Sequence, residues 1–197
     1  MDGYKDLVYD RFDAFFANLM VDEGGYVPQR QARIINDPGG ATIYGISLRF
    51  LKSCGINVGD LNHDGVIDAK DIVMLTQDQA KELYFLYFWN PLYDKILNVQ
   101  LANRIFNFGV NAGKVKSVLS IQQAVNDTLQ GSQIEVDGVF GNGSLEAVNG
   151  LQTSSLYNNY ILRIANYYKS LNKPQFLNGW LNRLKRLITP AYLRGVK

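Results

Sequence analysis

The chain has 197 residues and a net charge of +2, and 47% of its residues are hydrophobic. This length allows one large domain or two small ones, and the composition excludes a disordered chain. The sequence contains no apolar run of the roughly 18–20 residues that a membrane-spanning helix requires. An intrachain disulfide is excluded because Cys54 is the only cysteine, and we expect it to be a small, at least half-buried thiol.

Charge is distributed unevenly along the chain. After Glu146 the sequence contains eight basic residues and no acidic one, so the C-terminal region is cationic. Such a region is attracted to an anionic polymer or surface, although the same residues could simply form a solvated helix face. Residues 1–6 show no cationic segment leading into an apolar core, so we expect no Sec signal and folding in the cytoplasm.

The first predicted helix covers residues 8–23. Its apolar residues follow the spacing of one buried helix face, namely Phe12, Phe15, Phe16, Leu19 and Met20. Glu23 returns to nearly the same side, and Gly24-Gly25 ends the helix directly after it. Desolvation and the negative end of the helix dipole both favour the protonated carboxyl group. Glu23 is therefore our candidate general acid.

The rest of the chain predicts a mostly α protein. A loop rich in Gly, Pro, Asn and Asp covers residues 24–45, with a small hairpin at 43–45, and Ser47 then caps a short helix. Thr76 and Gln79 form a capping box for a helix that stops at Asn90-Pro91. Further helices are expected at 102–109, 114–129, after the turn at 137–144, at 154–171 and at about 175–187.

Residues 60–71 fit the twelve-residue loop of EF-hand-like calcium sites. Gly65 stands at the sharp turn of position 6, Ile67 is the apolar anchor at position 8, and His63 at position 4 is expected to point outward. Because position 12 is Asp, where EF-hands use Glu, the segment resembles the loop of dockerin modules. The expected ligands of a structural Ca²⁺ ion are Asp60, Asn62, Asp64, the carbonyl of Val66, Asp68 and Asp71. The alternative is an Asx-rich turn that holds its shape without metal.

The candidate chemistry depends on carboxylates. The only histidine, His63, lies in the calcium-type loop, so Ser–His and Cys–His triads are excluded, and zinc hydrolysis lacks ligands. Glycoside hydrolysis is the commonest carboxylate chemistry, with Glu23 as acid. A Glu at a helix end, followed by Asp37 in a loop and then by Thr42, resembles the order in phage-type lysozymes. The resemblance implies that Asp37 and Thr42 hold a water molecule, although both residue types are also common in turns and strand edges. Aromatic side chains that could stack on sugars are Tyr26, Tyr44 and Trp89.

The ordered motifs resemble glycoside hydrolase family 108. The matching segments are 23–26 (Glu-Gly-Gly-Tyr), 37–47 (Asp-Pro-Gly-Gly-Ala-Thr-Ile-Tyr-Gly-Ile-Ser), 87–89 and 92–94. Segments 106–113, 121–126, 136–141 and 176–183 are similar to the predicted peptidoglycan-binding module of the same family. The resemblance covers nearly the whole chain. This chain differs from the family pattern at Asn107, where many relatives carry Asp.

The resemblance implies a lysozyme-like helical fold with a Gly-rich active-site loop or small hairpin. It divides the chain into a muramidase region, 8–95, and a peptidoglycan-binding helical region, 98–187. The implied activity is hydrolysis of the β-1,4 bond between N-acetylmuramic acid and N-acetylglucosamine, with Glu23 as catalytic acid and Asn107 and Asn111 among the substrate-binding residues. A lytic transglycosylase and a non-catalytic wall-binding or secretion-related protein are the alternatives.

The expected partner is peptidoglycan. We expect no nucleic acid, no membrane span and a monomeric protein, which reaches the cell wall or periplasm after release from the cytoplasm. An inverting reaction would place the two carboxyl groups about 6.5–9.5 Å apart, whereas a retaining one would place them about 5–5.5 Å apart.

Overall fold

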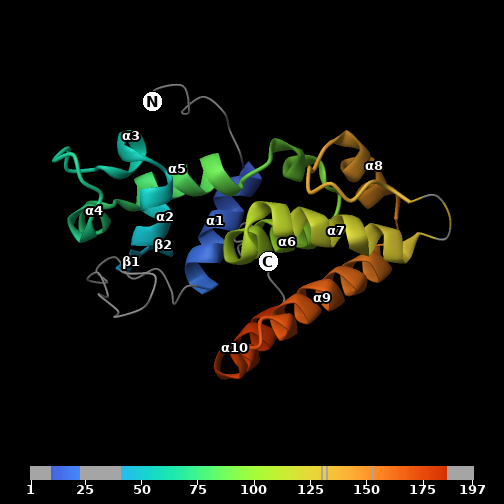
Figure 1. Cartoon of the computed structure of the whole chain (residues 1–197). Coiled ribbons are helices and arrows are strands. Elements are labelled where there is room, and N and C mark those ends of the chain that lie inside the picture. The colour runs from blue at the N-terminus through green and yellow to red at the C-terminus, as the bar shows by residue number, and fades with distance from the viewer. Residues whose placement is uncertain (1–9, 23–40, 130, 132, 152, 186–197) are drawn as a thin grey trace, which may run out of the picture. The chain divides into compact units, whose positions relative to one another are not determined.

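The computed structural model of the chain describes residues 10–22, 41–129, 131, 133–151 and 153–185 (Figure 1). The described part is mainly helical, with one two-stranded sheet. This confirms the predicted fold class. The chain divides into two compact units, which are described separately below. The larger unit comprises Met1–Asn18 and Tyr87–Lys197, and the smaller unit comprises Leu19–Leu86.

In its described residues, the smaller unit contains the end of α1 (Asp10–Asp22), the sheet and four further helices. Strands β1 (Thr42–Ile43) and β2 (Ile46–Ser47) pair antiparallel through a two-residue turn at Tyr44 and Gly45, which both have positive φ. The helices are α2 (Leu48–Ser53), α3 (Ile56–Gly59), α4 (Ala69–Met74) and α5 (Gln77–Phe88), whose last residues belong to the larger unit. The hairpin predicted from the sequence is therefore present.

Local side-chain caps set the helix boundaries in the smaller unit, as the sequence predicts. The Ser47 hydroxyl accepts a hydrogen bond from the amide of Phe50 and begins α2. Thr76 and Gln79 bond reciprocally before α5, with each side chain accepting from the other residue's amide. Two short helices, α3 and α4, were not predicted, because four to six residues give little periodicity to detect.

Gly59 fixes how closely α3 approaches α2. A Cβ atom at this position would lie 2.6 Å from the Leu51 carbonyl oxygen and 2.7 Å from Cδ1 of Ile67. Only a glycine allows this approach without displacing the α2 backbone. It also brings the anchor residue Ile67 of the calcium-type loop against α3.

The larger unit consists of helices and one 3₁₀ turn. Its elements are the first part of α1 (Asp10–Asp22), η1 (Pro91–Lys95), α6 (Val99–Ala112), α7 (Lys114–Thr128), α8 (Asn142–Gly150), α9 (Thr153–Ser170) and α10 (Pro174–Lys185). Helix α6 is buried along most of its length and packs against α7, which packs in turn against α9. None of the described helices is both long and apolar enough to cross a membrane.

An aromatic cluster forms the core between α1, α6 and the end of α5. The Trp89 ring lies 5.4 Å from Phe12, 5.8 Å from Phe15 and 5.6 Å from Phe106, and its edge contacts Tyr93. Arg11 ties the same region together, since it donates to the carbonyl oxygens of η1 and of the residue after it. These contacts place residues 87–95 with α6, so the two compact units divide the chain differently from the predicted regions 8–95 and 98–187.

Candidate functional site

The helix that leads to the candidate acid is present as predicted. Helix α1 ends at Asp22, and its predicted apolar face is buried, from Phe12 at 3% exposure to Leu19 at 0%. Glu23 follows it directly in the chain. Glu23 itself, Tyr26 and Asp37 lie outside the described residues, so their predicted roles stay predictions.

Thr42 and Tyr44 lie on the β-hairpin of the smaller unit. Thr42 is opposite Ser47 in the sheet, and the amide of Leu48 donates to the Ala41 carbonyl at 2.9 Å, which holds the start of the hairpin. Tyr44 occupies the left-handed turn position, and its carbonyl accepts a hydrogen bond from the hydroxyl of Tyr84 at 3.0 Å. Both side chains are partly exposed. The segment that follows the Gly-rich loop is therefore anchored to α5.

Trp89 lies in the core rather than on a surface. It is 3% exposed, and its ring is surrounded by the aromatic cluster described above. Its indole nitrogen is buried and has no hydrogen-bond partner among the described residues. In this conformation Trp89 offers no ring face to a sugar, and its contribution is to hold η1 and the end of α5 against α6.

Asn107 and Asn111 lie one turn apart on α6 in the larger unit. Asn107 is 3% exposed, while Asn111 is exposed and donates from Nδ2 to the Asn107 carbonyl oxygen at 2.8 Å. The Asn111 Oδ1 accepts a hydrogen bond from Arg183 of α10 at 2.6 Å. One turn earlier, Asn103 is 1% exposed, and neither polar atom of its side-chain amide has a hydrogen-bond partner in the part of the chain that the structure describes. The sequence named the two asparagines as candidates but not Arg183, which it marked only as part of the cationic C-terminal region and of the matching segment 176–183.

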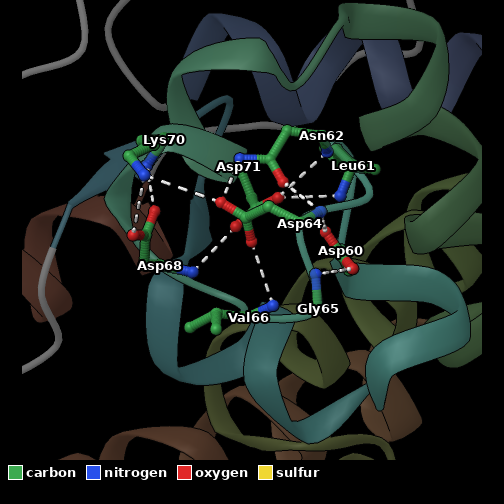
Figure 2. A network of polar contacts seen from close by, with 9 residues as sticks. All are labelled: Asp60, Leu61, Asn62, Asp64, Gly65, Val66, Asp68, Lys70 and Asp71. Atoms are coloured by element: carbon green, nitrogen blue, oxygen red, sulfur yellow. Dashed lines mark hydrogen bonds and ion pairs between the residues drawn. The ribbon is translucent and has the colours of Figure 1, made fainter.

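The calcium-type loop is closed by hydrogen bonds to its own carboxylates (Figure 2). Asp71 is fully buried and accepts from the amides of Leu61 at 2.7 Å, Asn62 at 3.2 Å and Asp68 at 2.7 Å. Burial raises the pKa of the Asp71 carboxyl, but the three backbone donors lower it more, and the net pKa lies below its ordinary value. Asp71 therefore joins the two ends of the loop as an ionised acceptor.

The other acidic residues of the loop shape its centre. Asp60 accepts from the amides of Asp64 at 3.2 Å and Gly65 at 2.8 Å, and Gly65 has the positive φ predicted for position 6. Lys70 lies 3.5 Å from the Asp64 carboxylate and 3.8 Å from that of Asp68. His63 is exposed, as expected. The side chains thus adopt the Asx turns that an EF-hand-type loop requires.

The donor set of this loop suits a hard cation, because it consists of carboxylate, amide and carbonyl oxygens. In the part of the chain that the structure describes, however, no three His, Cys, Asp or Glu side chains converge closely enough to hold a metal ion. The chemistry of the loop therefore fits Ca²⁺, while its closed arrangement depends on hydrogen bonds within the chain.

A second polar network anchors the turn that precedes α8. Gln122 of α7 is buried; its Oε1 accepts from the amide of Gly138 at 2.9 Å, and its Nε2 donates to Asp137 at 2.7 Å. The same nitrogen lies within hydrogen-bond distance of the Val139 carbonyl and of the Ser144 hydroxyl. The Val139 amide and the Gln122 side chain hold the pKa of Asp137 below its ordinary value. The sequence showed these segments separately but not that one glutamine joins them.

Two family models match this chain. The model of Glycosyl hydrolase 108 matches residues 16–113, and the model of the Predicted Peptidoglycan domain matches residues 116–185. The chain belongs to the glycosyl hydrolase 108 family. A structure of Brucella abortus SagA is similar to it, with 25% identity and a TM-score of 0.68, over 90% of this chain and 91% of that one. No curated protein matches the chain.

The family assignment gives the described elements their context. The glycosyl hydrolase 108 segment begins within α1 and contains the hairpin, the calcium-type loop and α6, whereas the peptidoglycan segment begins in α7 and ends with α10. The two matched segments support a glycosidase that acts on peptidoglycan. The Gln122 network lies within the peptidoglycan segment, whereas the Arg183 contact joins that segment to Asn111 of the glycosyl hydrolase 108 segment.

Proposed function

We propose that this protein is an N-acetylmuramidase, which hydrolyses the β-1,4 bond between N-acetylmuramic acid and N-acetylglucosamine in peptidoglycan. The observation that carries the proposal is the pair of consecutive family matches, a glycosyl hydrolase 108 segment followed by a predicted peptidoglycan domain. The order of Glu23, Asp37 and Thr42 in the first of these segments supports it.

Glu23 is the general acid in this proposal. The buried apolar face of α1 supports this role, because a carboxyl group that continues such a face is partly removed from water. The negative end of the helix dipole acts in the same direction. A protonated Glu23 would deliver its proton to the glycosidic oxygen as the bond to the sugar breaks.

Asp37 and Thr42 would position the attacking water on the opposite face of the sugar. Thr42 starts a hairpin that is held by the Ala41–Leu48 hydrogen bond and by the Tyr44–Tyr84 contact, so its backbone is fixed. A fixed hydroxyl and a carboxylate are the groups that a water needs for orientation and deprotonation. We propose inversion at the anomeric carbon, an outcome that requires room for a water molecule between the two carboxyl groups and a separation of about 6.5–9.5 Å.

The decisive experiment is a digest of purified peptidoglycan with the wild type and with Glu23→Gln. The wild type should release reducing ends with muramic acid at the new terminus, and the variant should release none while its circular dichroism spectrum and melting temperature are unchanged. Glu23→Asp serves as a second variant that keeps the charge but shortens the side chain. Lysis by Glu23→Gln at the wild-type rate would refute the proposal.

The same digest separates the proposal from its two rivals. A lytic transglycosylase would use the same acid but leave 1,6-anhydro ends, which mass spectrometry detects. A wall-binding protein without turnover would sediment with peptidoglycan and release no reducing ends. Asp37→Asn adds a further distinction, because it should impair hydrolysis strongly but leave a transglycosylase active.

We also propose that the loop 60–71 binds a structural Ca²⁺ ion. The residues that would hold it are Asp60, Asn62, Asp64, Asp68 and Asp71, together with the carbonyl of Val66. The hard-oxygen donor set and the Asx turns around Gly65 support this proposal. The ion would contribute to the stability of the loop and would take no part in the reaction.

A further inference from the structure

Three aromatic rings of α9 and α10 form a column, in which the inner pair is stacked and the outer pair is tilted. The rings of Tyr168 and Trp180 are 5.2 Å apart and 27° from parallel, and those of Trp180 and Phe176 are 5.8 Å apart at 31°. Tyr168 is 6% exposed, Trp180 is partly exposed, and Phe176 is 52% exposed. The column therefore begins in the core and ends in solvent.

The inner end of the column belongs to the core, but the outer end does not. Tyr168 contacts Phe108 of α6 edge-on at 5.8 Å, and this contact holds α9 against α6. Phe176 lies in the first turn of α10, where its amide donates to the Lys173 carbonyl at 3.1 Å. A polar residue would satisfy the same helix start. The phenyl ring thus extends the column outward with little evident structural need.

Cationic side chains lie near the Tyr168 end of the column. The Nζ atom of Lys116 lies 5.6 Å from the centre of the Tyr167 ring, which is next to Tyr168. Burial raises the pKa of Tyr168, and the nearby charge of Arg183 opposes this effect in part. Arg183 also donates a hydrogen bond to Asn111. The sequences of α9 and α10 contain no acidic residue. The surface is therefore aromatic and positively charged.

We propose that this surface, formed by Phe176, Trp180, Lys116 and Arg183, binds a glycan strand of peptidoglycan. The inference rests on the proposed function and deepens it, by naming the residues with which the C-terminal segment holds its polymer. The apolar faces of the sugar rings would stack on Phe176 and on the exposed part of Trp180. Lys116 and Arg183 would attract the carboxylates of the peptide stems.

Charge complementarity selects this occupant. Peptidoglycan combines a chain of pyranose rings with anionic peptides, which matches a row of rings beside cations. A second copy of the chain would bring the same positive surface against itself, which like charges oppose. All the described residues of this surface lie within, or directly beside, the segment that matches the Predicted Peptidoglycan domain.

Co-sedimentation with insoluble peptidoglycan tests the proposal in a Glu23→Gln background, in which the polymer stays intact. Phe176→Ala should weaken the apparent affinity about three- to tenfold, the range expected when one stacking contact is lost. Leu162→Ala is the matched control, because Leu162 is 59% exposed on α9 and is not part of the column. Lys116→Gln should weaken binding and reduce its dependence on salt.

Tryptophan fluorescence provides a second readout with a soluble probe, the β-1,4-linked hexamer of N-acetylglucosamine. The chain has two tryptophans, of which Trp89 is 3% exposed and Trp180 is partly exposed. The hexamer should change the emission of the Glu23→Gln protein, and the change should be lost in Trp180→Phe. An emission change that persists in Trp180→Phe would contradict the assignment.

The possible failures are distinguishable. If Phe176→Ala and Leu162→Ala bind peptidoglycan as tightly as their parent, the inference is overturned, while lysis by the wild type and its loss in Glu23→Gln leave the proposed function standing. Phe176→Ala could instead alter the sedimentation coefficient or the melting temperature without affecting binding. The ring is then covered by another copy or another segment of the chain, and this result also overturns the inference. If the wild type neither binds nor cleaves peptidoglycan, the proposed function fails first.

Discussion

Removal of the Asp71 carboxylate should destabilise the smaller unit even when no calcium is present. The side chain is fully buried and joins Leu61, Asn62 and Asp68, which lie at opposite ends of the loop. Asp71→Ala leaves these three amides without an acceptor. Asp71→Asn keeps one oxygen for Leu61 and Asn62 but places an amide group opposite the N–H of Asp68.

The size of the effect follows from the hydrogen bonds. A net contribution of about 1–1.5 kcal/mol for each of the three gives roughly 3–4.5 kcal/mol for Asp71→Ala, and about half of this for Asp71→Asn. For a protein of this size, 1 kcal/mol corresponds to about 2–4 °C. We therefore expect Asp71→Ala to lower the melting temperature of the transition by roughly 6–18 °C.

Thermal unfolding in excess EDTA, followed by circular dichroism, measures this effect. Because hydrogen bonding holds the pKa of Asp71 below its unfolded value, the stability it adds is present above about pH 4 and is lost as the pH falls through the lower, folded pKa. The difference between wild type and Asp71→Ala should accordingly shrink in acid. Melting temperatures within 1 °C of each other in EDTA at pH 7 would refute the reasoning, as would a difference that appears only when calcium is added.

Three further predictions concern other parts of the chain. In the wild type, 1 mM CaCl₂ should raise the melting temperature, because a ligand at one hundred times its dissociation constant adds about 2.7 kcal/mol to the free energy of unfolding. Asp64→Ala should remove this rise, whereas Asp78→Ala, outside the loop, should keep it. Equal melting curves of the wild type with and without calcium would exclude the site. Gly59→Ala should lower the free energy of unfolding in urea by about 1–3 kcal/mol, since the new methyl group would lie 2.6 Å from the α2 backbone. An unchanged urea midpoint would show that α3 can move away from α2. Gln122→Leu should lower the free energy of unfolding by about 2–4 kcal/mol, because it removes the buried partner of the Gly138 amide and of the Asp137 carboxylate. Amide hydrogen exchange at Gly138 should accelerate in this variant. Unchanged protection of that amide would contradict the link between Gln122 and the turn.

Features that depend on neighbours in the chain could be predicted from the sequence. The Ser47 cap, the Thr76–Gln79 capping box and the turn at Gly65 each involve residues only a few positions apart. The apolar spacing of α1 likewise predicted its buried face. Fixed spacing determines whether such groups can meet, so these elements follow from local geometry and hydrogen bonding alone.

Features that depend on which helices pack together could not be predicted in this way. Trp89 and Trp180 are the same residue type, yet the first lies in the core and the second is partly exposed beside Phe176. Nothing in the spacing of Asn107 indicated that it would be 3% exposed. The links of Gln122 to Asp137 and of Arg183 to Asn111 cross between separate elements.

The amino-acid sequence alone therefore determined the family, the mostly helical class and the chemistry that the chain can support, because motif order, periodicity and residue type are properties of the chain itself. Only the tertiary structure decided which rings are exposed, which amides are buried and which cations lie near the column on α9 and α10. The physical reason is that burial and long-range polar contacts arise from the packing of elements far apart in the chain, and that packing is set by the shapes of many side chains together.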